Sequence, residues 1–200
     1  MHNPSKTKAV LELGAIDISG IQEEISQLPE SFWDEQNEGK PNNFQEFYQT
    51  KHIVFKFVHD LNDCTKSYEF PLWEKWKNKI MPILEQAVKP FGYTNGVFSR
   101  IMLAKLTAGS DIKAHKDGNK AATFPHKIHV PIVTNDKVMF FVNPKSYHFK
   151  EGYGYEVNNL AVHYVENQGE QDRIDLIFEY FNPDHLPENT SMPMQAHKDI

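Results

Sequence analysis

Between residues 97 and 181, apolar and polar residues alternate in short segments that are separated by Gly, Pro and Asn. Alternation with a period of two is typical of half-buried β-strands. No stretch between these segments has the length and period of a helix, so the pattern predicts an antiparallel sandwich or barrel. The predicted strands are residues 97–106, 111–115, 126–133, 137–142, 153–157, 160–165 and 172–181.

The first 95 residues have a mixed pattern, which predicts a helical and β addition that packs on this core. The polar start of the chain predicts frayed backbone, and Ser19 is the candidate N-cap of a first helix. Residues 50–58 are rich in β-branched and aromatic side chains and predict a strand. Residues 71–89 predict the strongest helix, and its apolar stripe predicts a packing face: Trp73, Trp76, Ile80 and Ile83.

Length and composition predict one structural domain. A chain of 200 residues with 40% hydrophobic content can bury one sizeable core. We expect the addition to span residues 1–95, the β core residues 96–182, and a surface tail residues 183–200. The net charge of −6 and the lack of a dense basic cluster exclude a nucleic-acid partner. The oligomeric state stays open.

Cysteine usage and hydropathy predict a cytoplasmic protein. The single cysteine, Cys64, cannot form an internal disulfide, and the start of the chain lacks the pattern of a secretion signal. No run approaches the length of apolar sequence that a membrane-spanning helix needs, so no contact with a membrane is expected.

The stretch "DIKAHKDGNK" places His115 and Asp117 two residues apart after a predicted strand. Side chains two apart on a strand project from the same face, so both can bind one metal ion while Lys116 points away. The plain alternative is a surface turn shaped by Asp117 and the glycine after it. The same triplet recurs at His197–Asp199, but so near the C-terminus no framework would fix two ligands.

One imidazole and one carboxylate need a third ligand, usually a second histidine, to hold Fe(II) with open positions. His163 is the candidate, because its surroundings are apolar and strand-like. If the chain turns around Gln168 and Gly169, His163 and Arg173 lie opposite each other on paired strands, about 5 Å apart at Cβ. They would then face one cavity suited to a small dicarboxylate, which chelates the metal and accepts a bidentate salt bridge from Arg173. The plain alternative for Arg173 is an ion pair with Asp175.

Two strands have one apolar and one polar face, which is typical of a sheet that lines a pocket. In "HKIHVPIV", one face carries Ile128, Val130 and Ile132 and the other carries Lys127 and His129. In the last strand the apolar set alternates with a more polar set, which consists of Arg173, Asp175, Ile177 and Glu179.

The order of an HxD motif, an "HVPI" strand and H-x9-R resembles Fe(II)/2-oxoglutarate-dependent oxygenases, specifically the aspartyl/asparaginyl β-hydroxylase family, over residues 97–182. The resemblance implies a mainly β fold with flanking helices, a double-stranded β-helix (jelly roll, cupin-like), with Fe(II), 2-oxoglutarate and O2 as cofactors. It also implies roles for individual residues: iron ligation by His115, Asp117 and His163, a clamp on the distal carboxylate of 2-oxoglutarate by Arg173, and a place beside 2-oxoglutarate for His129 and Lys127. Lys127 stands where the family tends to have arginine. The positive charge is kept, but the fork-shaped guanidinium, which can bind a carboxylate through two parallel hydrogen bonds, is lost.

The resemblance implies hydroxylation of an Asp or Asn side chain in a peptide or protein. A compact chain without a recognisable peptide-binding module suits a free amino acid such as proline equally well. Arg100 and Lys105 could hold a substrate carboxylate in either case. A non-catalytic cupin-like module that binds a metal and a small acid would not need Arg173, and a zinc hydrolase would need a general base that is not evident.

Overall fold

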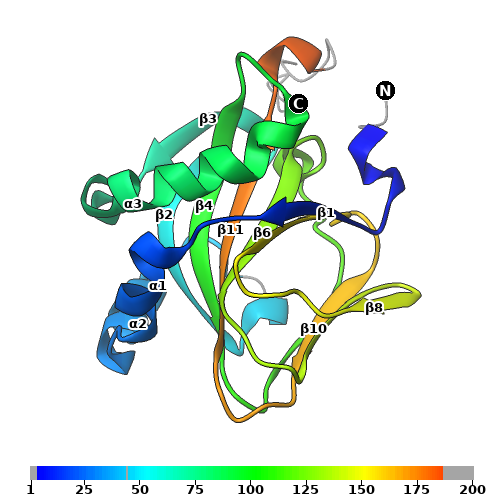
Figure 1. The fold of residues 1–200 in the computed structure, drawn as a ribbon. Helices are drawn as coiled ribbons and strands as arrows, with labels where there is room; N and C mark the ends of the chain where they lie inside the picture. Colours follow the sequence, from blue (N-terminus) through cyan, green and yellow to red (C-terminus); the bar gives the residue numbers. More distant parts are fainter. Residues whose placement is uncertain (1–3, 44, 187–200) are drawn as a thin grey trace, which may run out of the picture.

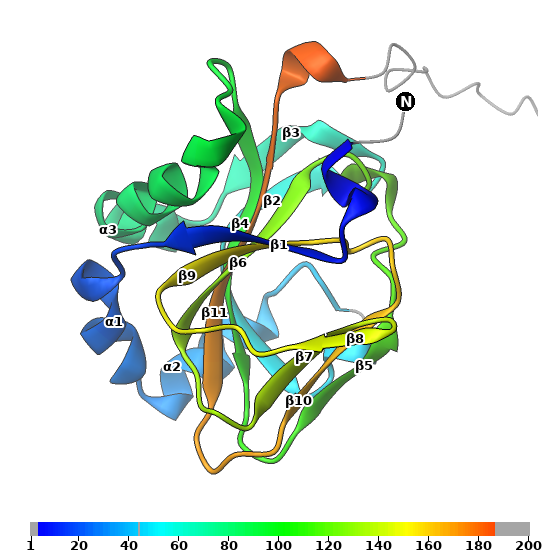
Figure 2. The same ribbon diagram turned by 45° about the vertical axis from the view of Figure 1, so that its right-hand side comes forward.

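Two antiparallel β-sheets form the centre of the protein, in a computed structural model that describes residues 4–43 and 45–186 (Figure 1). The larger sheet has the strand order β1-β9-β6-β11-β4-β2-β3, and the smaller has the order β5-β10-β7-β8. Figure 2 shows the two sheets as facing layers, and the predicted mainly β jelly-roll architecture is confirmed.

The strands of the larger sheet are β1 (Val10–Ala15), β2 (Thr50–Asp60), β3 (Asp63–Glu69), β4 (Val97–Leu106), β6 (His126–Val133), β9 (Tyr153–Val157) and β11 (Arg173–Phe181). Those of the smaller sheet are β5 (Asp111–His115), β7 (Val138–Val142), β8 (Lys145–Tyr147) and β10 (His163–Asn167). The helices are α1 (Ser19–Ser26), α2 (Glu30–Glu38) and α3 (Pro71–Val88). Five short 3-10 helices complete the described elements: η1 (Pro4–Thr7), η2 (Gln45–Phe47), η3 (Lys89–Phe91), η4 (Lys120–Ala122) and η5 (Pro183–His185).

Most predicted strands are confirmed, but the start of the chain differs from the prediction. Residues 10–15, for which no strand was predicted, form β1, which pairs with β9 at one edge of the larger sheet. Ser19 is not an N-cap, because Ile18 occupies that position and Ser19 is the first helical residue. The backbone N–H of Ser19 instead donates to Asp17 Oδ1 at 3.0 Å, so the aspartate supplies the acceptor at this helix end.

The main hydrophobic core lies between the helices and the outer face of the larger sheet (Figure 1). The stripe of α3 packs here, which confirms it as a packing face: Trp73, Trp76, Ile80 and Ile83 are buried. Ile128, Val130 and Ile132 of β6 point into the same core. Their neighbours Lys127 and His129 face the other side of the sheet, as the alternation predicted.

His163 and Arg173 do not lie on paired strands, which corrects the predicted hairpin. β10 pairs with β5 and β7 in the smaller sheet, whereas β11 pairs with β4 and β6 in the larger sheet. Each strand therefore has a neighbour on both sides, and the chain between them crosses from one sheet to the other. The two residues face the space between the layers from opposite sheets.

Residues 1–95 supply β1, β2 and β3 to the larger sheet as well as the covering helices. Within the described part of the chain, no helix has both the length and the apolar character needed to cross a membrane.

Candidate metal centre

Three side chains that the sequence singled out meet at one point between the sheets. His115 ends β5, Asp117 follows it, and His163 begins β10 directly opposite His115 in the strand pairing. One ligand atom from each residue lies within 4.8 Å of the others. The two imidazole rings have centroids 4.3 Å apart, and His115 Nε2 is 3.8 Å from Asp117 Oδ1.

Both histidines are held so that Nε2 is the atom free to bind a metal. His115 Nδ1 lies 2.7 Å from the carbonyl oxygen of Lys113, and His163 Nδ1 lies 3.0 Å from that of Ala161. A carbonyl only accepts, so Nδ1 carries a proton in each ring, and Nε2 is the nitrogen left to face a metal ion. Burial lowers the pKa of His163 to about 4, so this imidazole is neutral at pH 7.

Asp117 is an ionised carboxylate whose side chain is 9% exposed. Its Oδ2 accepts hydrogen bonds from Lys127 Nζ at 2.9 Å and Asn159 Nδ2 at 3.0 Å. Burial by itself would raise the pKa of Asp117, but the charge of Lys127 and these two hydrogen bonds outweigh it and hold the pKa well below its usual value. The three residues thus offer two imidazole nitrogens and one carboxylate oxygen, a donor set that fits Fe(II).

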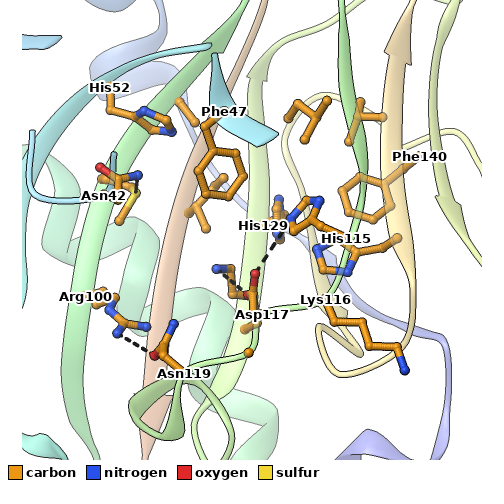
Figure 3. A pocket seen from close by; sticks show the side chains of 18 of the residues that line it. Asn42, Phe47, His52, Arg100, His115, Lys116, Asp117, Asn119, His129 and Phe140 are labelled. Atoms are coloured by element: carbon orange, nitrogen blue, oxygen red, sulfur yellow. Dashed lines mark hydrogen bonds and ion pairs between the residues drawn. The ribbon is translucent and has the colours of Figure 1, made fainter. Parts of the chain in front are cut away.

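The three residues border a cavity of about 440 Å³ between the sheets, which Figure 3 shows from close by. Its volume is in the usual range for small-molecule sites. The smaller sheet contributes an apolar wall of Ile112, Phe140 and Val165. The larger sheet contributes residues of alternating positions on β4, β6 and β11, namely Arg100, Met102, Ala104, Lys127, His129, Arg173 and Ile177.

Arg173 faces this cavity. It also forms an ion pair with Asp175, which the sequence predicted as the alternative to a role as carboxylate clamp. Asp175 is bonded to His129 Nδ1 as well, at 3.1 Å. Asp175 contacts one terminal nitrogen of the guanidinium, so the fork keeps donors for an anion in the cavity. Burial lowers the pKa of His129 although Asp175 acts in the opposite direction, so His129 is a neutral neighbour of the clamp.

Lys127 and Arg100 line the cavity with their charges already paired. Lys127 Nζ donates to Asp117 and lies 3.8 Å from Glu179 Oε1. Arg100 Nη1 donates to both oxygens of Glu179 at 2.7 and 2.9 Å, and its Nη2 donates to Asn119 Oδ1 at 3.0 Å. Both side chains therefore order the polar end of the cavity.

Lys105 does not line the cavity, which corrects its prediction as a substrate contact. Alternate residues of a strand face opposite sides, and on β4 Arg100, Met102 and Ala104 face the cavity. Lys105 has the other parity, lies under the helices near Trp33, and forms ion pairs with Glu30 and Asp172.

Several residues of the cavity wall were not predicted. Asn42, Phe47 and His52 come from the first 95 residues, where the sequence carries no metal-ligand or anion-binding pattern. Asn159, which lies outside the cavity wall and donates to Asp117, also had no signal, since asparagine in a turn is common. The second triplet, His197–Asp199, lies outside the described residues.

Solved structures with a similar fold belong to several oxygenases. An oxidoreductase of the 2OG-Fe(II) oxygenase family from Burkholderia pseudomallei has a TM-score of 0.51 at 15% identity, and the match covers 66% of this chain and 65% of that one. The viral collagen prolyl hydroxylase of Paramecium Bursaria Chlorella virus-1, in its 2OG complex, has a TM-score of 0.51 at 10% identity, with 87% and 96% covered. The Ni complex of the non-heme monooxygenase ThoJ has a TM-score of 0.55 at 11% identity, with 89% and 75% covered. At such identities the likeness concerns the fold.

A family comparison extends over most of the chain. No curated protein sequence matches it. The family model described as Aspartyl/Asparaginyl beta-hydroxylase matches residues 19–183, including the segment before residue 97 that the sequence motifs did not reach. The chain therefore belongs to the aspartyl/asparaginyl β-hydroxylase family, which confirms the resemblance predicted from its motifs.

Proposed function

We propose that this protein is an Fe(II)- and 2-oxoglutarate-dependent oxygenase that hydroxylates an amino-acid side chain. The observation that carries the proposal is the meeting of His115, Asp117 and His163 within 4.8 Å at a cavity that Arg173 lines from the opposite sheet. Two imidazole nitrogens and one carboxylate oxygen can hold Fe(II) and leave coordination positions for other ligands. When bound, the metal and 2-oxoglutarate supply the oxidising power for breaking a C–H bond with O2.

The side chains of the protein bind and orient the reactants. His115 and His163 present Nε2 and Asp117 presents Oδ1, while Arg173 binds the distal carboxylate of 2-oxoglutarate through the donors that Asp175 leaves free. The neutral ring of His129 borders the same carboxylate without adding charge. The apolar wall around Phe140 limits the access of water to the reacting groups.

For the substrate we propose an Asp or Asn side chain of a peptide or protein, which the family match supports. A free amino acid such as proline is the alternative, since the cavity of about 440 Å³ is of a size that suits a small molecule. We also propose a cytoplasmic location, which the use of a single, buried cysteine supports.

The test is aerobic incubation with Fe(II) and 2-oxoglutarate, with separate additions of Asp- and Asn-containing peptides and of free amino acids. Succinate formation together with the gain of one oxygen atom by a peptide residue supports the proposal, and oxidation of free amino acids alone supports the alternative. Asp117→Ala is the inactive control. If no substrate increases succinate formation above that of this control, the oxygenase proposal is wrong.

A non-catalytic cupin-like module is separated from the oxygenase by Arg173→Ala. In the oxygenase this change leaves metal affinity unchanged and abolishes 2-oxoglutarate binding, because the distal carboxylate loses its charged partner. Calorimetric titration with Mn(II), and then with 2-oxoglutarate under nitrogen, measures the two affinities independently of turnover.

A further inference from the structure

A chain of hydrogen bonds connects the carboxylate of Asp117 to Lys6, near the N-terminus. Asn159 is the middle residue of this chain, and it is 0% exposed. Its backbone carbonyl accepts from the N–H of Asp117 at 2.9 Å, and its side-chain Nδ2 donates to Asp117 Oδ2 at 3.0 Å. One residue thus holds both the backbone and the carboxylate of Asp117.

Lys6 determines which way the amide of Asn159 faces. Lys6 Nζ donates to Asn159 Oδ1 at 2.5 Å and to the carbonyl oxygen of Ala122 at 3.1 Å. Burial lowers the pKa of Lys6 to about 8, so the amine is still protonated at pH 7 and can only donate.

The oxygen of the Asn159 amide must therefore face Lys6. Its Nδ2 is left with two acceptors, Asp117 Oδ2 and the carbonyl oxygen of Ala122, both at 3.0 Å. The reversed amide would place hydrogen-bond donors against the ammonium and an oxygen against the carboxylate, so a single orientation satisfies every group.

The two oxygens of Asp117 differ as a result. Oδ2 accepts from both Asn159 and Lys127, at 3.0 and 2.9 Å, whereas Oδ1 lies 3.8 Å from His115 Nε2 on the side of the ligand cluster. A carboxylate with one oxygen occupied by two donors presents the other oxygen to a metal ion. Hydrogen-bonding partners of this kind orient metal ligands and raise metal affinity.

We propose that Asn159 and Lys6 are positioning residues that fix the Asp117 carboxylate so that it binds the metal through Oδ1. The N-terminal segment is then part of the metal centre, although it is remote in sequence from all three candidate ligands. The inference rests on the proposed function, in which Asp117 is a metal ligand.

The segment that carries Lys6 has a second attachment, which provides a matched control. Asn158 Nδ2 donates to the backbone carbonyl of Lys6 at 2.7 Å and does not contact Asp117. Asn158→Ala therefore weakens the docking of η1 while it leaves the amide of Asn159 between Lys6 and Asp117.

The test measures Co(II) affinity and the Co(II) absorption spectrum of the full chain for the wild type and for Asn159→Leu, Lys6→Met, Lys6→Arg and Asn158→Ala. We expect Asn159→Leu to weaken Co(II) binding by about 10- to 100-fold, the usual effect of removing a partner of a metal ligand. Lys6→Met should weaken it less and change the spectrum in the same direction, because the amide oxygen of Asn159 then loses its partner and the amide is held by its two acceptors alone. Lys6→Arg keeps a hydrogen-bond donor at this position and should have the wild-type Co(II) spectrum. Asn158→Ala should also have the wild-type spectrum.

The outcomes separate this inference from the proposed function. If the wild type and Asp117→Ala bind Co(II) equally, the proposed function fails. If the wild type binds Co(II) through Asp117 but folded Lys6→Met and Asn159→Leu match it in affinity and spectrum, the positioning role is refuted. Should Asn159→Leu not fold, the comparison of Lys6→Met with Lys6→Arg decides the question.

Discussion

Glu179→Gln should destabilise the protein strongly, because it leaves Arg100 as a buried cation without its counter-charge. The side chains of Arg100 and Glu179 are 6% and 2% exposed, and Arg100 Nη1 is bonded to both carboxylate oxygens. Removing one member of a buried ion pair costs about 3–5 kcal/mol of unfolding free energy. Lys127 Nζ, 3.8 Å from Glu179, loses a neighbouring negative charge as well.

Urea denaturation at 25 °C measures the loss, provided that the m-value is unchanged. The matched control is Glu74→Gln, because Glu74 pairs with Lys77 at 2.8 Å on the surface, where the side chains are 68% and 40% exposed. We expect that control to lose less than about 1 kcal/mol. The double variant Arg100→Met, Glu179→Met should recover most of the loss, since it leaves no unpaired charge. A loss below about 1 kcal/mol for Glu179→Gln would refute the reasoning, because the pair would then behave as an exposed one.

Three further predictions concern Arg173 as the carboxylate clamp, the buried His52, and Lys105, which lies outside the cavity. Arg173→Lys should weaken 2-oxoglutarate binding by about tenfold or more, since one lost charge-assisted hydrogen bond is worth about 1.5–3 kcal/mol; unchanged affinity in calorimetry would argue against the clamp. Burial lowers the pKa of His52 to about 3, so the folded state binds its proton less readily than the unfolded state. The stability that neutral His52 contributes is complete above about pH 6.5 and falls by about 1.4 kcal/mol per pH unit below it. In urea titrations from pH 7 to pH 4, His52→Asn should therefore lose less stability than the wild type, and parallel curves would contradict this. Lys105→Met should leave KM for 2-oxoglutarate and for substrate unchanged, because Lys105 lies under the helices. A raised KM would contradict this placement and indicate that Lys105 contacts one of the two ligands.

Alternation along single strands made the inner and outer faces of the sheets predictable. Ile128 and His129 illustrate this, because a one-residue step moves a side chain from the helix-covered core to the cavity. The same rule separates Arg100 from Lys105 on β4, because residues five positions apart on a strand face opposite sides of the sheet. The two-residue spacing of His115 and Asp117 also predicted that they meet, although Asp117 lies just beyond the end of β5.

Contacts between segments that are distant in the sequence were harder to predict. The prediction that His163 and Arg173 meet across a hairpin was wrong, because both edges of β10 and of β11 are taken by other strands. Lys6 and Asn159 each have an ordinary local sequence, and their link to Asp117 exists because β1 and the turn before β10 bring remote segments together. Such contacts have no period or motif from which they could be predicted.

The most direct test of the central claim is anaerobic titration of the protein with Fe(II) in the presence of 2-oxoglutarate, followed by visible absorption. We predict that the wild type binds one equivalent of Fe(II) and develops a charge-transfer band that requires 2-oxoglutarate, and that His163→Ala loses both. A His163→Ala variant that binds Fe(II) and develops the band as the wild type does would contradict the metal centre described here.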